Sequence, residues 1–98
     1  MVDQENQVTR VIVTAEVENS AIWVDAFRSH VDLFNSYTST AIHFTATGDN
    51  EVAILWEVSD LDQYLAQMAS PETAAAMAND GVNQDSVKVY VLDKEIDL

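Results

Sequence analysis

The chain has 98 residues, 48% of them apolar, which is enough for one domain with a hydrophobic core and too few for two domains. It has no cysteine, so disulfide bonds and thiolate metal sites are excluded. Seventeen acidic residues against four basic ones give a net charge of −13, which would repel nucleic acids and anionic membrane surfaces. We therefore expect neither a nucleic acid nor a membrane as a partner.

The ends of the chain predict two short tails, residues 1–7 and 93–98, around a single domain. The N-terminal tail is acidic and polar, without the basic and apolar regions of a signal peptide. No apolar run is long enough to cross a bilayer. These features predict a cytoplasmic protein.

The first half of the chain predicts a strand, an amphipathic helix and a second strand. Apolar and polar residues alternate over residues 8–17 and 40–47, as in strands with one buried face. Asn19 or Ser20 is suited to cap a helix over residues 21–37. At 100° per residue, one stripe of this helix is aromatic and also carries a histidine. The stripe consists of Trp23, Phe27, His30, Phe34 and Tyr37.

The second half of the chain predicts a third strand, a helical region and a last strand. Gly48 begins a turn, after which residues 52–58 alternate as a strand. Ser59 with Asp62 resembles a capping box before a helix whose apolar side holds Tyr64 and Met68. Ser70 and the proline after it restart a helix that ends near Gly81, so residues 70–81 could belong to one bent helix or a second helix. The last strand is predicted over residues 87–92.

The predicted sheet has one almost wholly apolar face and one mixed face. The two helical regions should cover the apolar face. The mixed face would leave an apolar patch of a kind that monomers seldom expose, and a partner laid face to face would bury it. Its residues are Arg10, Ile12, Thr14, Glu16, Ala41, His43, Thr45, Ala53, Leu55, Glu57, Lys88, Tyr90 and Leu92. We therefore expect a homodimer.

The βαββαβ order resembles the dimeric α/β-barrel superfamily over nearly the whole chain. The resemblance also rests on Phe27 with His30, on the run LWEVSDLD from Leu55 to Asp62, and on Ser70-Pro71-Glu72 followed by Gly81-Val82. It implies an α+β, ferredoxin-like fold with a four-stranded antiparallel sheet, two of which form a barrel in the dimer. The superfamily includes antibiotic-biosynthesis-type monooxygenases without cofactors, haem-degrading monooxygenases, isomerases and small proteins of unknown function. Its ligands usually lie between sheet and helices.

His30 is the residue that most strongly indicates chemistry. It lies in the aromatic stripe of the first helix, where an unpaired buried imidazole would cost about 1–3 kcal/mol. It could be a core histidine bonded to a carbonyl or a tyrosine hydroxyl. It could also be the polar anchor of an apolar pocket, kept neutral by burial and able to act as a base. A catalytic role needs a second polar group nearby, for which Tyr37 and Tyr64 are candidates.

The aromatic and methionine side chains around His30 are either simple core or the wall of an apolar cleft for a small molecule. The expected wall consists of Trp23, Phe27, Phe34, Trp56, Tyr64 and Met68, with His30 at the polar end. In related haem-degrading proteins a Trp near the place of Trp56 acts with an Asn on the first strand and a His on the second helical segment. Neither is present here, so haem degradation is disfavoured.

His43, Glu57 and Tyr90 share the mixed face of the predicted sheet. His43 and Glu57 lie on strands joined by a hairpin and are expected to be direct or diagonal neighbours. With Tyr90 they could form a base oriented by a carboxylate beside a phenol. They could equally be polar contacts of the dimer interface, with Glu16 and Lys88 as a further cross-strand pair.

Three hypotheses on function follow. The first is a dimer that binds an apolar or amphipathic small organic molecule between sheet and helices. The second is a cofactor-independent monooxygenase or isomerase with His30 as general base. The third is a structural dimer without a ligand. No metal is expected, because the two histidines lie on different faces, cysteine is absent and the carboxylates are scattered. No cofactor is expected either, and the sequence has no glycine-rich phosphate loop.

Overall fold

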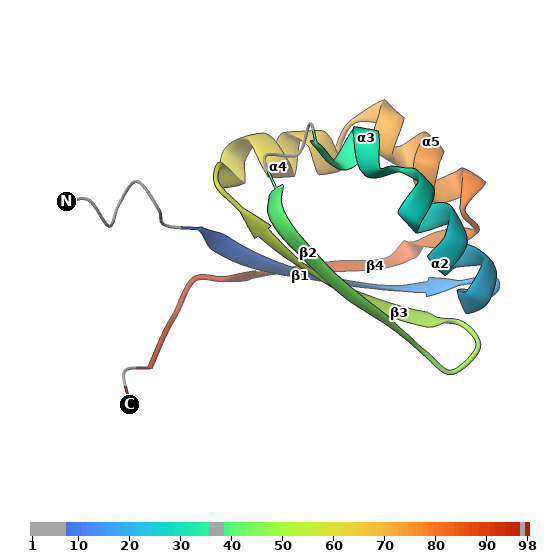
Figure 1. Ribbon diagram of the computed structural model, residues 1–98, viewed down its shortest axis with the longest axis horizontal. Helices are drawn as coiled ribbons and strands as arrows, with labels where there is room; N and C mark the ends of the chain where they lie inside the picture. The colour runs from blue at the N-terminus through green and yellow to red at the C-terminus, as the bar shows by residue number, and fades with distance from the viewer. Residues whose placement is uncertain (1–7, 36–38, 97) are drawn as a thin grey trace.

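The computed structural model describes residues 8–35, 39–96 and 98 as a four-stranded antiparallel sheet with four helices on one of its faces (Figure 1). The strands lie in the order β2-β3-β1-β4, so the first strand is central and the second and fourth form the edges. The elements are β1 (Thr9–Val17), α2 (Ser20–Ser29), α3 (Val31–Phe34), β2 (Ser39–Thr47), β3 (Glu51–Val58), α4 (Leu61–Met68), α5 (Pro71–Asn79) and β4 (Val82–Leu92). This confirms the predicted α+β, ferredoxin-like βαββαβ fold.

The first helical region is two helices rather than the one predicted over residues 21–37. Asn19 caps α2 by accepting a hydrogen bond from the Ile22 N–H at 3.0 Å. The helix ends at Ser29, whose hydroxyl donates to the Ala26 carbonyl at 2.6 Å, and His30 follows with φ −95° and ψ 23°. The His30 N–H donates to the Phe27 carbonyl, and α3 restarts after it. Because this break lies inside the apolar stripe, the side-chain pattern did not reveal it.

The second helical region is also two helices, which resolves the alternative left open by the sequence. The cap of α4 is Asp60, which accepts from the Gln63 N–H at 3.1 Å, so the predicted capping box starting at Ser59 is wrong by one residue. Ser70 caps α5 by accepting from the Thr73 N–H, with Pro71 as the first helical residue. Gly81 follows α5 with φ +77°, a left-handed conformation that glycine adopts without strain.

The last strand begins at Val82 instead of residue 87, and its register against β1 shifts between Thr14 and Glu16, where β4 carries extra residues between Asn83 and Lys88. Lys88 is therefore opposite Thr14, and Glu16 is opposite Asn83. The predicted Glu16–Lys88 pair is wrong. Near this shift the Glu16 N–H donates to the Ser86 hydroxyl at 2.8 Å.

The hydrophobic core lies between the helices and the face of the sheet that they cover, here called the inner face. Aromatic rings form its centre: Trp23 stacks on Phe27 with centroids 4.6 Å apart, and Phe34 packs edge-on against Trp56 at 5.3 Å. The buried apolar residues are Val11, Val13, Val17, Trp23, Phe27, Phe34, Val52, Ile54, Trp56, Val58 and Tyr64. The predicted apolar face is therefore the covered one.

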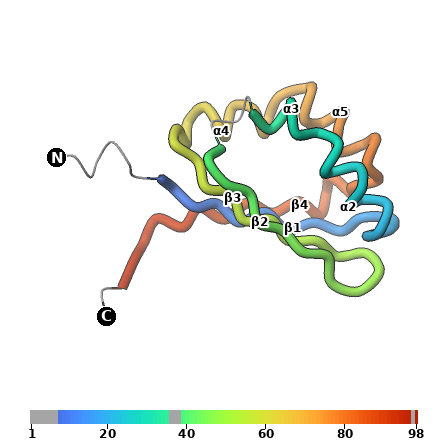
Figure 2. Tube along the Cα trace, in the orientation of Figure 1, coloured from blue at the N-terminus to red at the C-terminus, as the bar shows by residue number. Residues whose placement is uncertain are grey.

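The outer face of the sheet carries no helix, as the trace in Figure 2 also shows. Cross-strand pairing places its residues in rows, such as His43, Leu55, Ile12 and Tyr90 from edge to edge. Tyr90 is 49% and Leu92 45% exposed. The residues of the outer face are Arg10, Ile12, Thr14, Ala41, His43, Thr45, Ala53, Leu55, Glu57, Lys88, Tyr90 and Leu92.

Candidate functional site

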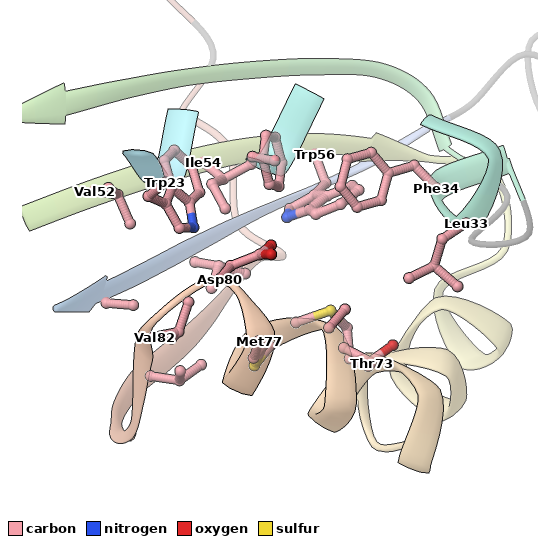
Figure 3. Close-up of a pocket in the computed structure, with 16 residues that line it drawn as sticks. Trp23, Leu33, Phe34, Val52, Ile54, Trp56, Thr73, Met77, Asp80 and Val82 are labelled. Atoms are coloured by element: carbon pink, nitrogen blue, oxygen red, sulfur yellow. The ribbon is translucent and has the colours of Figure 1, made fainter. Parts of the chain in front are cut away.

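A cavity of about 60 Å³ lies between the inner face and the helices (Figure 3). The sheet contributes one wall, α2 and α3 a second, and the C-terminal part of α4 with α5 a third. Its lining residues are Val13, Ala15, Trp23, Phe27, Leu33, Phe34, Val52, Ile54, Trp56, Met68, Thr73, Ala76, Met77, Asp80, Val82 and Val87. The lining is apolar except for very few groups, which is the usual form of a site for a small organic ligand.

Asp80 is the charged residue among those that line the cavity. Its side chain is only 5% exposed, and its Oδ1 accepts a hydrogen bond from His30 Nε2 at 3.1 Å. The Asn79 side-chain amide donates to the same oxygen at 3.4 Å. The contact with His30 is an ion pair when the imidazole is protonated and a neutral-donor hydrogen bond otherwise. Asp80 thus connects the end of α5 to the break between α2 and α3.

The local chain geometry fixes Asp80 at this position. It is the C-terminal cap of α5, and its N–H donates to the Ala76 carbonyl at 3.0 Å. Gly81 then turns the chain into β4, and a Cβ at that position would come within 3.4 Å of Glu18. Because helix and turn hold the backbone on both sides, the carboxylate is directed inward, between Trp23 and Trp56 in Figure 3.

Thr73 is the second buried polar residue of the lining, at 4% exposure. Its hydroxyl donates to the Gln67 carbonyl at 2.7 Å and receives a hydrogen bond from the Ser70 hydroxyl at 3.2 Å. This hydroxyl therefore fixes the junction between α4 and α5. Its donor is already used, so the carboxylate of Asp80 is the stronger polar feature of the cavity.

Most of the ligand-binding residues predicted from the sequence come together around the cavity. Five of them line it, namely Trp23, Phe27, Phe34, Trp56 and Met68. Tyr64 is fully buried and packs against Trp56 with ring centroids 5.4 Å apart, but it is not among the lining residues. It belongs to the core behind the cavity wall.

His30 also lies outside the lining, beside the cavity rather than in it. Its side chain is 24% exposed, and its polar partner is Asp80 instead of a tyrosine. Tyr37, the other tyrosine considered as its partner, lies outside the described residues. The imidazole is thus held at the rim, with the carboxylate between it and the apolar space.

Sequence reasoning missed the contributions of Asp80, Thr73 and Leu33 to the lining. The sequence Asn79-Asp80-Gly81 is typical of an exposed turn at a helix end, so it gave no sign of a buried carboxylate. A pairing with His30, 50 residues earlier, depends on how α5 packs over the sheet. No local pattern could have revealed it.

Of the three polar residues expected to lie close together on the outer face, His43, Glu57 and Tyr90, only the first two do so. His43 is opposite Leu55, so it is a diagonal neighbour of Glu57, and His43 Nε2 lies 3.5 Å from Glu57 Oε2. This confirms the expected proximity. Tyr90, however, lies on the other edge strand, three strand spacings or roughly 14 Å away. The hypothesis that His43, Glu57 and Tyr90 act together as base, carboxylate and phenol is therefore wrong within one subunit.

Two further features of the described part of the chain bear on function. None of its helices has the length and apolarity needed to span a membrane. It also holds no cluster of three or more His, Asp or Glu residues that could bind a metal ion. Fold and cavity together define a ferredoxin-like α+β protein with an apolar space under its helices.

No protein-family model matches the sequence, and no curated protein matches it. Solved structures do match its fold. A candidate antibiotic biosynthesis monooxygenase from Bordetella bronchiseptica has a TM-score of 0.72 at 9% identity, over 91% of this chain and 98% of that one. SnoaB, a cofactor-independent oxygenase from Streptomyces nogalater, has a TM-score of 0.65 at 14% identity, over 93% and 95%.

A third similar structure contains a ligand. It is the monooxygenase encoded by ActVA-Orf6 of Streptomyces coelicolor, in complex with Nanaomycin D, with a TM-score of 0.62 at 13% identity over 93% of this chain and 90% of that one. At these identities the likeness shows a shared fold. It confirms, at the level of fold, the resemblance to antibiotic-biosynthesis-monooxygenase-type proteins that the sequence suggested.

Proposed function

We propose that this protein binds an apolar or amphipathic small organic molecule in the cavity between the sheet and the helices. The observation that supports this most directly is a buried carboxylate, Asp80, turned into an otherwise apolar space walled by Trp23 and Trp56. Burying a carboxylate is costly unless it is paired, and the pairing of Asp80 with His30 and Asn79 uses only Oδ1, which leaves the second oxygen for a ligand. The complex of a similarly folded monooxygenase with Nanaomycin D adds support from analogy.

The size of the cavity limits what it can take without rearrangement. About 60 Å³ has room for roughly two water molecules at about 30 Å³ each, whereas pockets for drug-sized ligands measure about 300–1,000 Å³. A larger ligand must displace part of the wall. Met68 and Met77 are half-buried there and are suited to move, because methionine is unbranched and flexible.

The proposed functional unit is a homodimer that buries the outer faces of two sheets against each other. Tyr90 and Leu92 are about half exposed on this face, and Ile12 and Leu55 are half-buried beside them. An apolar patch of this kind on a sheet without a covering layer favours a partner. A two-fold partner presents the same surface in return.

Native mass spectrometry of the gently purified protein tests both parts of this proposal. We expect the mass of a dimer with a defined organic adduct. Ala76→Leu, which fills the cavity, should abolish the adduct, while Ala75→Leu on the exposed side of α5 should retain it. A dimer without any adduct, in protein from several sources, would support the structural alternative without a ligand. A monomer would contradict the proposed assembly.

A second function has a specific observation in its favour. The His30–Asp80 hydrogen bond of 3.1 Å is the arrangement in which a carboxylate orients an imidazole for general base catalysis. This supports the alternative of a cofactor-independent monooxygenase or isomerase, and the similarly folded SnoaB is a cofactor-independent oxygenase. Oxygen uptake with an enolisable hydroxyaromatic such as anthrone tests it. The alternative predicts uptake that His30→Gln abolishes, and it is excluded if His30→Gln and wild type behave alike.

A further inference from the structure

We infer that Asp80 is the residue that contacts the polar end of the ligand, and that it selects a neutral hydroxyl over a carboxylate or an ammonium. This inference rests on the proposed binding function and specifies its ligand. It transfers the polar contact from His30, which lies outside the lining, to the carboxylate that lies within it.

The two oxygens of Asp80 have different surroundings. Both hydrogen bonds of the carboxylate, from His30 and from Asn79, end on Oδ1. Within the described residues no hydrogen bond reaches Oδ2, although the side chain is only 5% exposed. A carboxylate oxygen can only accept hydrogen bonds. Because the side chain of Asp80 has lost most of its contact with water, a ligand that donates a hydrogen bond to Oδ2 gains affinity from this oxygen.

The indole of Trp23 supplies the complementary group. It lines the cavity, and its ring nitrogen is turned toward the same space as the carboxylate of Asp80 in Figure 3. An indole N–H can only donate. Among the described residues none accepts a hydrogen bond from Trp23, whose side chain is 2% exposed. The polar end of the cavity therefore presents Oδ2 of Asp80 as an acceptor and the N–H of Trp23 as a donor.

A hydroxyl group satisfies both groups because it donates one hydrogen bond and accepts another. A carboxylate head offers no donor and would be repelled by Asp80, in a protein whose net charge is −13. An ammonium head would pair with Asp80, but it has only donors and could not accept the hydrogen bond that the N–H of Trp23 offers. The limited cavity of about 60 Å³ also favours a compact head group.

His30 acts in this arrangement as a positioning residue. Its Nε2 lies 3.1 Å from Oδ1, which fixes the carboxylate rotamer and leaves Oδ2 toward the cavity. His30→Gln can keep a donor to Oδ1, whereas His30→Leu removes it. We expect Gln to preserve, and Leu to weaken, the discrimination between head groups.

Binding of 1-butanol, butanoate and butylammonium, which share one apolar tail, tests the inference. ¹H–¹⁵N spectra report directly on the site, because the indole N–H signals of Trp23 and Trp56 lie at the cavity. We expect saturable shifts with 1-butanol and at least about tenfold weaker binding of butanoate. Butanoate binding as well as 1-butanol would overturn the role of Asp80. Butylammonium binding more tightly than 1-butanol would overturn the role of Trp23.

Asp80→Asn reverses the polarity of the site with almost no change of volume. His30 can still donate to the amide oxygen, so the amide NH₂ group is directed into the cavity in place of the acceptor. We expect the affinity for butanoate, relative to that for 1-butanol, to rise by about tenfold or more over the wild type. Asp85→Asn, an exposed residue with the same change of charge, should leave the order of affinities unchanged. An unchanged order in Asp80→Asn would overturn the inference, and the wild-type comparison decides it if this variant does not fold.

Xenon separates failure of this inference from failure of the proposed binding function. It enters apolar cavities without any polar contact. If xenon shifts the indole signals but the three head groups bind alike, the cavity binds ligands and only the assignment of Asp80 fails. If neither xenon nor any butyl compound shifts them, the binding function itself fails, and this inference with it.

Discussion

The two faces of the sheet each carry a histidine–carboxylate pair, and the pairs differ in almost everything except their chemistry. On the helix-covered side, His30 and Asp80 are 3.1 Å apart, with side chains 24% and 5% exposed. On the outer face, His43 and Glu57 are 3.5 Å apart, with side chains 64% and 23% exposed. The first pair joins residues 50 positions apart, and the second lies on neighbouring strands of one hairpin.

The difference shows how surroundings decide the value of a polar contact. Water solvates the exposed pair, so forming it replaces contacts that were already adequate. The carboxylate of Asp80 has lost most of its water, so breaking its hydrogen bond leaves a buried charge unsatisfied. The His30–Asp80 pair is therefore expected to stabilise the fold, whereas the His43–Glu57 pair is expected to do so only if a partner covers it.

The largest expected effect on stability comes from the packing of the core between the inner face and the helices. Trp56→Ala should reduce the free energy of unfolding by about 3–5 kcal/mol, because the ring is 2% exposed and packs against Phe34 and Tyr64. Ile22→Ala, at a position 65% exposed on α2, should change it by no more than about 0.5 kcal/mol. Denaturant unfolding of both variants measures this, and equal losses would contradict the assignment of the core.

The next largest effect concerns the outer face. A carboxylate placed at the centre of this face by Ile12→Asp would be buried without a partner in the proposed dimer. We expect the dissociation constant of the dimer to rise by about 100-fold or more, corresponding to about 3 kcal/mol. Sedimentation at several concentrations measures it, with Ala75→Asp on the exposed side of α5 as control. An unchanged dimer would mean that another surface holds the two subunits together.

The inner pair should follow with a smaller effect. A double-mutant cycle with His30→Ala and Asp80→Ala should give a coupling of about 1–3 kcal/mol, since the hydrogen bond involves an ionised and nearly buried group. Chemical unfolding of the four proteins supplies the energies. A coupling near zero would show that the two side chains meet without stabilising the junction of α2, α3 and α5.

Features that follow from the periodicity of a single strand or helix could be predicted from the sequence. Alternation with a period of two identified all four strands and assigned Trp56 and Ile12 to opposite faces, because that period belongs to the backbone of a strand. The aromatic stripe likewise identified most of the cavity wall, since helix periodicity places Trp23 and Phe27 on one side.

The remaining features depend on contacts between distant parts of the chain. The break at His30 interrupts a continuous apolar pattern and becomes visible only where the side chain meets Asp80. The register shift opposite Thr14 and Glu16 breaks the alternation of β4, so Val82 and Val87 both line the cavity although they are an odd number of residues apart, which only the pairing with β1 reveals. For the same reason the carboxylate of the site was missed, since its burial is decided by the packing of α5 and not by its own neighbours in the sequence.

The smallest expected effect is that of the outer pair, and it depends on assembly. In a monomer the coupling between His43 and Glu57 should not exceed about 0.5 kcal/mol, because both groups are solvated. In the proposed dimer the pair would lose water, and the same cycle of His43→Ala and Glu57→Ala should give about 1 kcal/mol or more. Measuring it in wild type and in the Ile12→Asp background separates the two states. If the coupling is equally small in both, the outer pair stays solvated, and the partner covers the sheet nearer to Tyr90 and Leu92 than to the hairpin.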